Sequence, residues 1–307
     1  MIDPMIGPIT RLLAVFVGLA LAGALRAVEP APAAPAAGLD TALIERLTGA
    51  KGALDAKEEV FKVSVPRIDL GLEVNGVRVT PRLGLTSWAA FKRMGDRAMV
   101  MGDLVLREDQ VNAVMSTALD NGLEVTALHN HFLGDSPRVM FMHIGGHAPL
   151  EPLATAVGAV FRSLRETPAP APRATIDPAK SDLDPKAVEQ ILGRAGDFKD
   201  GVLRFSIGKA SHMHGEEIGN AMGVNTWAAF AGGQDQAVVD GDFAMYESEL
   251  QAVLKALRKA GINVAAIHNH MTDETPRIVF LHYWGIGPAA QLARGLKSAL
   301  DAQAAIR

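Results

Sequence analysis

The 307-residue chain contains no cysteine. That absence excludes disulfides, thiolate metal sites, cysteine nucleophiles and a lipid-modified cysteine. An excess of positive charge is missing too, because 30 lysines and arginines stand against 34 aspartates and glutamates. A chain without a basic surface gives no support for a nucleic-acid partner. No serine-centred elbow, phosphate loop or dinucleotide fingerprint occurs in a usable context, so no nucleotide cofactor is expected.

Long apolar runs are also missing. The N-terminal run, Leu12 to Leu25, has about 14 residues, which is shorter than the roughly 20 that span a bilayer. Arg11 precedes this run and small residues follow it, a pattern typical of an export signal that is cleaved after Ala24 or Ala27. We therefore predict a signal peptide over residues 1–27, no stable membrane span after cleavage, and a Pro/Ala linker over 28–38. An uncleaved anchor is the alternative, because Asp3 and the single Arg11 make the charged N-terminal region weak.

The histidines form a repeated pattern. Six of the nine lie in two blocks: Ala127-Leu-His-Asn-His131, then Pro137-Arg138 and Phe141-Met-His143; and Ala266-Ile-His-Asn-His270, then Pro276-Arg277 and Phe280-Leu-His282. The offset between the blocks is a constant 139 residues. Aligned without a gap, residues 84–143 and 223–282 are identical at 23 of 60 positions, which indicates an internal duplication.

This duplication predicts an α+β fold made of two related halves. Each half is expected to contain a βαββα kernel with extra N-terminal strands, and the halves to pack about a pseudo-twofold axis; independent domains are the alternative. The first repeat covers residues 39–166 and the second covers 181–307. A second Pro/Ala linker, residues 167–180, separates them.

Apolar periodicity places the elements of the first half. Val111, Val114, Met115 and Ala118 follow helical spacing, and Asn75-Gly76 is a strong hairpin signal. The expected helices are 41–48, 109–121 and 150–165, and the expected strands are 60–65, 70–79, 98–106, 123–131 and 138–144.

The histidine pairs carry the chemistry. A strand over 123–131 would place Val125, Ala127, His129 and His131 on one face, with the two imidazoles about 6.5–7 Å apart at Cα. Such a pair can grip one cation, and catalytic zinc sites use three protein ligands and an open fourth position. A tight turn before His143 would leave it too far along the hairpin from His131 to share an ion.

The third ligand therefore stays open. In the first half the further candidates are Asp103 and Glu108. The second half is richer, because it has two more histidines and two adjacent carboxylates without counterparts in the first: His212, His214, Glu216 and Glu217.

Other interpretations of these histidines compete with a metal site. They could be core residues that bond the backbone or each other, or they could act on an organic ligand. A nuclease of the His-Asn-His type is rejected, because such enzymes spread their motif over some 30 positions around a metal finger and need a basic surface.

The neighbouring motifs are ambiguous as well. Arg138 and Arg277 could hold a carboxylate or phosphate. They could instead form a salt bridge within the turn, to Asp135 or Glu274 respectively. The aspartates of Gly102-Asp103 and Gly241-Asp242 are expected to be turn or helix-cap residues, and Trp88 and Trp227 core anchors.

Long blocks of the chain resemble the LppY/LpqO family, bacterial exported proteins classed as a domain of unknown function. The resemblance rests on Gly215–Phe230, Val239–Phe243, Ala266–Met271, Phe280–Gly285 and their first-half equivalents. It covers about residues 40 to 300 and implies an envelope location without an activity. The name-giving members are lipoproteins, but this chain lacks the lipobox cysteine, so a periplasmic or secreted form is expected.

We expect a protein that binds a divalent metal, zinc first and copper second, through His268 and His270, completed by His282, His212 or His214. The equivalent or degenerate first-half site would contain His129, His131 and His143. An enzyme of this kind would use metal-activated water on an ester, amide or phosphoester, with a base among Glu216, Glu217 and Glu247. The alternative is a non-catalytic envelope module that binds a small anionic ligand, or another envelope partner, in the groove between the halves through the histidines and through Arg138 and Arg277.

Overall fold

A computed structural model describes residues 38–170 and 172–306. The predicted signal peptide and all but the last residue of the first linker lie outside these residues. The described chain contains six helices and a large antiparallel sheet. The fold is therefore mixed α and β, as the sequence predicts.

The first half begins with helix α1 (Thr41–Thr48). The Asp40 side chain accepts a hydrogen bond from the Leu43 N–H, and Gly49 ends the helix in the left-handed conformation. The main elements that follow are β1 (Gly52–Asp55), β2 (Val60–Pro66), β5 (Thr86–Met94), β6 (Arg97–Arg107), α2 (Val111–Asp120), β7 (Glu124–His129), β9 (Val139–Ala148) and α3 (Leu150–Ser163).

The second half repeats this order after a connection with little regular structure. Its helix α4 (Pro185–Leu192) begins at Asp184, whose side chain accepts from two backbone N–H groups, and ends at Gly193. The remaining elements are β10 (Asp197–Lys199), β11 (Val202–Gly208), β12 (Ser211–Met213), β13 (Glu216–Ile218), β14 (Asn225–Gly232), β15 (Ala237–Tyr246), α5 (Leu250–Lys259), β16 (Asn263–His268), β17 (Ile278–Gly287) and α6 (Ala289–Ala304).

One twelve-stranded sheet runs through both halves. Its order is β1-β2-β5-β6-β9-β7 in the first half, continued by β16-β17-β15-β14-β11-β10 in the second. The two sets join at an antiparallel bridge between Leu128 of β7 and Ile267 of β16. These two residues are 139 apart, so the junction pairs equivalent positions of the duplication.

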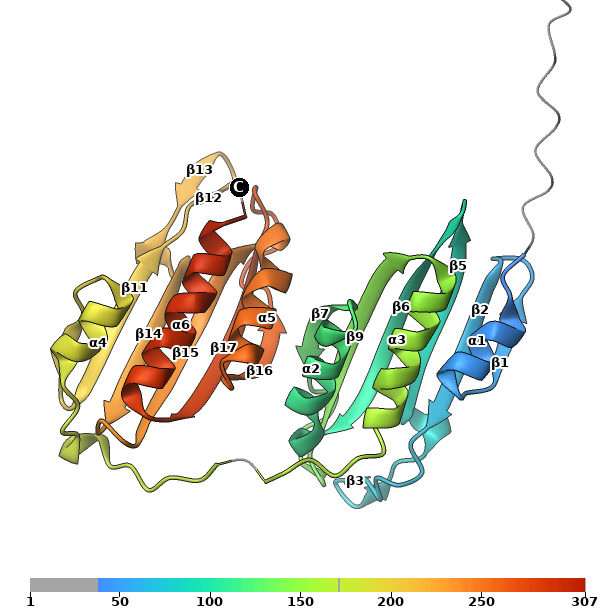
Figure 1. The fold of residues 1–307 in the computed structure, drawn as a ribbon, viewed down its shortest axis with the longest axis horizontal. Coiled ribbons are helices and arrows are strands. Elements are labelled where there is room, and N and C mark those ends of the chain that lie inside the picture. The colour runs from blue at the N-terminus through green and yellow to red at the C-terminus, as the bar shows by residue number, and fades with distance from the viewer. Residues whose placement is uncertain (1–37, 171, 307) are drawn as a thin grey trace, which may run out of the picture. The chain divides into compact units, whose positions relative to one another are not determined.

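Within each half the helices cover one face of the sheet (Figure 1). Their apolar stripes form the core: Val253, Leu254 and Leu257 of α5 are fully buried against the strands. Burying a side chain of this size stabilises the fold by about 1.5–3 kcal/mol. One continuous apolar cluster contains helix and strand residues of both halves.

The strand that carries the first histidines differs from the prediction. A β-bulge lies between Val125 and Ala127, and it reverses the in-out alternation. Val125 and Leu128 are therefore both buried in the core, whereas His129 lies on the face opposite to Val125. The strand also ends at His129, so His131 lies beyond it. The second half has the same bulge between Val264 and Ala266, and β16 ends at His268.

Two further expectations fail in part. The hairpin at Asn75-Gly76 forms, but its strands β3 (Glu73–Val74) and β4 (Val77–Arg78) have only two residues each. β3 also pairs with β8 (Asp135–Ser136), so the three strands form a small sheet outside the main one. Trp88 and Trp227 are not core anchors, because both are half-buried and absent from the buried core. Among the described residues, no helix is long and apolar enough to span a bilayer.

Candidate metal centre

Cross-strand register brings an aspartate to the histidines of the second half. Asp242 of β15 pairs directly with His282 of β17, and His282 pairs with Ala266 of β16. His268 is two residues further along β16, so it is a diagonal neighbour on the same face. Three strands thus bring Asp242, His268 and His282 to one place, although these residues are 14 to 40 positions apart in the sequence.

Asp242, His268 and His270 offer ligand atoms that all lie within 4.8 Å of one another. The two Nε2 atoms of His268 and His270 are 3.2 Å apart. Oδ2 of Asp242 lies 3.6 Å from Nε2 of His270 and 3.8 Å from Nδ1 of His282. This group could hold a metal ion.

The spacing suits a tetrahedral ion. Two ligand atoms about 2.0–2.1 Å from zinc at the tetrahedral angle lie about 3.3 Å from each other. The 3.2 Å between the histidine nitrogens matches this separation, and the 3.6 Å to Asp242 is slightly longer. Two nitrogens and one carboxylate oxygen are also a ligand set that zinc and copper accept.

Stacking fixes the ring that lies outside the strand. His270 lies parallel to the buried Phe280, with 3.5 Å between the ring centroids and 10° between their planes. The Asn269 side chain closes the loop by donating to the Met271 carbonyl. His270 is therefore positioned beside His268 although no strand hydrogen bonds hold it.

The electrostatics keep both histidines neutral. Burial, with smaller contributions from His282 and His270, lowers the pKa of His268 to about 4. Burial and then His282 lower the pKa of His270 as well. A neutral imidazole has a free lone pair for a metal ion, so both rings are ready to bind near neutral pH.

Asp242 is shifted in the opposite direction. Burial raises the pKa of its carboxyl to about 7; Asp240 adds to this, and a hydrogen bond from the Leu281 backbone partly offsets it. The residue is only 3 % exposed, and its Oδ1 is buried with no hydrogen-bond partner among the described residues. Nδ1 of His268 is likewise buried and unpartnered. Unsatisfied buried polar atoms are rare, and a bound ion beside Asp242 would account for its position.

The first half repeats this arrangement in a looser form. Asp103 pairs with His143 across β6 and β9, and Nε2 of His143 lies 3.1 Å from Nε2 of His129. His143 is thus close to His129, whereas the sequence-based expectation concerned its distance from His131. His131 stacks on Phe141 at 3.5 Å, as His270 does on Phe280. These residues do not gather three ligand atoms within 4.8 Å, whereas Asp242, His268 and His270 do.

The other predicted ligands and bases lie elsewhere. His212 on β12 and His214 in the following turn do not belong to the Asp242–His268–His270 group. β12 pairs with β13 in a separate two-stranded sheet, and Glu216 and Glu217 of β13 are exposed. His212 also exchanges two backbone hydrogen bonds with Thr275.

The arginines after the histidine pairs differ from each other. Nε of Arg277 lies 3.5 Å from Oε1 of Glu247. Arg277 therefore pairs with Glu247, and not with Glu274 in its own turn, which was one of the two alternatives from the sequence. Glu274 is buried and accepts from the Ile278 N–H. Arg138 forms no ion pair with any described residue.

A tryptophan and a cation flank each Asp–His pair. Trp227 pairs with Asp242 across β14 and β15, and the Arg204 guanidinium carbon lies 5.0 Å from the centroid of its ring. In the first half Trp88 pairs with Asp103, and Lys62 Nζ lies 3.8 Å from the ring centroid. The tryptophans therefore border the candidate sites, on the sheet face that carries the histidines.

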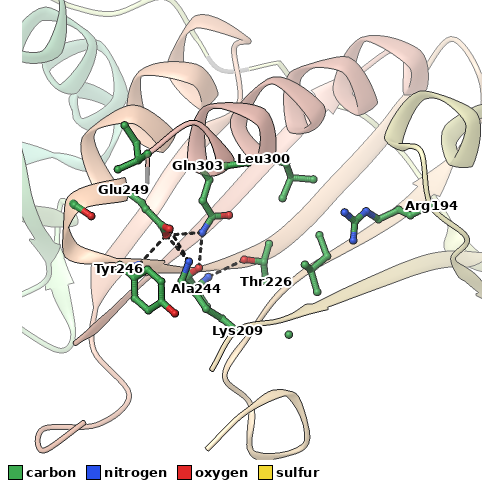
Figure 2. Close-up of a pocket in the computed structure, with 13 residues that line it drawn as sticks. Arg194, Lys209, Thr226, Ala244, Tyr246, Glu249, Leu300 and Gln303 are labelled. Carbon is green, nitrogen blue, oxygen red and sulfur yellow. Dashed lines mark hydrogen bonds and ion pairs between the residues drawn. The ribbon is translucent and has the colours of Figure 1, made fainter. Parts of the chain in front are cut away.

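A cavity of about 600 Å³ in the second half has a structural explanation (Figure 2). On its wall the buried Glu249 receives two hydrogen bonds from Lys209, at 2.6 and 2.8 Å, and one from Gln303. Glu249 also accepts from the Tyr246 N–H. Lys209 and Glu249 are therefore paired with each other, and this cluster holds α5 and α6 to the sheet. Arg194 also lines the cavity and forms no ion pair with a described residue.

Asp242 is the member of the candidate metal-binding group that the sequence interpretation missed. The available signal was the duplicated Gly-Asp dipeptide, Gly102-Asp103 and Gly241-Asp242. Both aspartates lie inside strands and neither caps a helix. Their role depends on which strand lies beside them, and the sequence does not give that neighbour.

Comparison with known proteins places the chain in a family. The family model described as "Domain of Unknown Function (DUF1259)" matches residues 42–163 and again residues 186–302. A solved structure, the trimeric bacterial microcompartment shell protein PduB, is 10 % identical over 82 % of this chain and 89 % of its own, with a TM-score of 0.19. That similarity carries no argument. No curated protein matches the sequence.

Proposed function

Since the chain belongs to this family of unknown function, we propose a function from its geometry: it binds a divalent metal ion, zinc first and copper second, through Asp242, His268 and His270. The observation that carries the proposal is the convergence of three ligand atoms within 4.8 Å. Supporting it are the 3.2 Å histidine spacing and the unpartnered Oδ1 of Asp242.

Three protein ligands suit a catalytic site, because they leave a fourth position for water or substrate. The ion would supply a water whose pKa is lowered to about 7, a nucleophile for hydrolysis of an ester, amide or phosphoester. His282 is the residue that could fill this fourth position, because its Nδ1 lies 3.8 Å from Oδ2 of Asp242. The position is open to water only if His282 does not bind the ion. A base would come from Glu216, Glu217 or Glu247, of which Glu247 is held by Arg277.

We further infer that the two halves follow the βαββα pattern and pack about an approximate twofold axis. The bridge between Leu128 and Ile267 supports this, because it joins equivalent residues. The N-terminal pattern and the resemblance to LppY/LpqO proteins support export to the periplasm or beyond.

Metal content of protein purified without a polyhistidine tag tests the proposal. After incubation with zinc and removal of the unbound metal by dialysis, we expect about one equivalent of zinc per chain, measured by inductively coupled plasma mass spectrometry. His268→Gln and Asp242→Asn should each lose it. His147→Gln changes an exposed first-half histidine and should retain it.

His214→Gln tests whether the third ligand is Asp242, as the structure suggests, or His214, which the sequence offered as a candidate. Retention of metal in this variant supports Asp242 as the third ligand, and loss would assign the site to the β12–β13 segment. Wild-type protein that binds no zinc in the presence of intact secondary structure would refute the metal site altogether.

A further inference from the structure

A second candidate site lies where the two halves meet. A cavity of about 440 Å³ is lined by Glu108, Arg138 and His129 of the first half and by Ala266 and His268 of the second. Its size lies within the range of pockets that bind small molecules, roughly 300–1,000 Å³. Leu133, Met140 and Phe132 give it an apolar wall.

The charges in this cavity are arranged differently from their copies in the second half. Glu247 and Arg277, the equivalents of Glu108 and Arg138, form an ion pair at 3.5 Å. In the first half the same two residue types face one cavity, yet they form no ion pair with each other or with any other described residue. The duplication therefore kept both charges and separated them at the cavity.

The neighbouring groups restrict which ligand fits. Asp135 also lines the cavity, so a purely anionic ligand would meet two carboxylates, and a purely cationic one would meet Arg138. Asp135 accepts the Val139 N–H at Oδ2 and keeps its charge, whereas the Glu108 carboxylate has no hydrogen-bond or ion-pair partner among the described residues. A ligand with one charge of each sign satisfies both unpaired side chains.

We propose that this cavity binds a small zwitterion, an α-amino acid with an apolar side chain. Arg138 receives its carboxylate, Glu108 receives its ammonium group, and the side chain packs against Leu133 and Met140. The inference goes beyond the metal site and shares only His268 with it, so the ligand lies beside the proposed metal centre.

L-Leucine is the probe, and its binding to the full chain is measured by calorimetry. We expect saturable 1:1 binding. Leucinamide lacks the carboxylate and 4-methylpentanoate lacks the ammonium group, so each should bind about 10-fold or more weakly, in line with the loss of one charged hydrogen-bonding group. Equal binding of leucine and 4-methylpentanoate would overturn the zwitterion and leave a carboxylate site.

Matched variants locate the site. Arg138→Gln and Glu108→Gln should each weaken leucine binding about 10-fold or more. Arg277→Gln removes the equivalent arginine outside the cavity, and Asp109→Asn removes an acid that pairs with Arg107; both should bind leucine as the wild type does. Equal weakening by Arg277→Gln would overturn the assignment.

Zinc content of the same samples keeps the two proposals separate. Arg138→Gln should lose leucine binding and keep its zinc. Wild-type protein that binds zinc but shows no heat with leucine up to 10 mM refutes the cavity inference alone. Leucine binding by protein that holds no zinc refutes the metal site alone.

Discussion

Asn112 and Gln251 occupy equivalent positions in the two halves, and each hydrogen-bonds the backbone of the opposite half. The Asn112 amide accepts from the Val264 N–H at 2.8 Å and donates to the Val264 carbonyl at 3.2 Å. Gln251 does the same with Val125, at 3.1 and 2.9 Å. Val125 and Val264 are themselves equivalent, so four bonds form two reciprocal pairs that lock β7 and β16 together at the bulges.

Replacing one of these amides should loosen the junction. Asn112→Ala leaves a backbone N–H and a carbonyl without partners, so we expect it to lower the free energy of unfolding by about 1–3 kcal/mol, measured by urea denaturation. Asn121→Ala, in which the lost amide bonds only the carbonyl of Thr117 in its own helix, should cost less. Equal losses for the two variants would contradict a role at the junction.

His282 should tune the metal site without being indispensable. Its Nδ1 is 3.8 Å from Asp242 and outside the group of three ligands. We expect His282→Ala to weaken zinc binding about 10–100-fold, the range seen when a residue that supports a ligand is removed, and His268→Ala to weaken it further. A competition titration with a chromophoric chelator measures both. If His282→Ala is the more damaging change, His282 is a ligand and the fourth position is closed.

Asp242 should give the metal-free protein a distinctive pH dependence. Its pKa is raised from 3.8 to about 7, so between these values the folded state keeps a proton that the unfolded state has released. The stability of the wild type relative to Asp242→Asn should therefore fall as the pH rises from about 4 to 7 and level off above it. Urea unfolding in the presence of EDTA measures the free energy of unfolding of both proteins at each pH. The lowered pKa of His268 changes stability in the opposite direction, but it does so in both proteins and therefore cancels in their difference. A difference independent of pH would contradict the raised pKa.

Copper should quench tryptophan fluorescence selectively. Trp227 pairs with Asp242, and Trp284 lies two residues from His282 on β17, whereas Trp88 borders the first-half residues. We expect Cu²⁺ at one equivalent to quench the wild type and the Trp88→Phe variant, and to affect the Trp227→Phe/Trp284→Phe double variant little. Quenching that persists in the double variant would show that Asp103 and the first-half histidines bind copper as well.

Local signals in the sequence located the three helices of the first half and most of its long strands, but not β1 or β5. Helix α1 runs from Thr41 to Thr48 as expected, because Asp40 and Gly49 are strong start and stop residues. Helix α2 follows the spacing of Val111, Val114, Met115 and Ala118. The sequence predicted the wrong sheet face for the histidines relative to Val125. The prediction assumed strict alternation of side chains along the strand, and the bulge at Val125–Ala127, which breaks that alternation, cannot be recognised from the sequence. The tryptophans were misplaced for a related reason: a strand with one buried face does not reveal which of its two faces a large aromatic residue takes.

The duplication, the absence of cysteine chemistry and the pairing of histidines in each half were determined by the sequence itself, because each is a property of residue identity and spacing. Tertiary structure decided which residues complete the site. Asp242 joins His268 and His270 only because β17 lies between β15 and β16 in the register that sets Asp242 against His282. Likewise, the cavity that Glu108 and Arg138 face gains its second wall, Ala265, Ala266 and His268, because the edge strands of the two halves meet at Leu128 and Ile267. Such neighbours are fixed by hydrogen bonding between distant strands, and no local pattern in the chain encodes them.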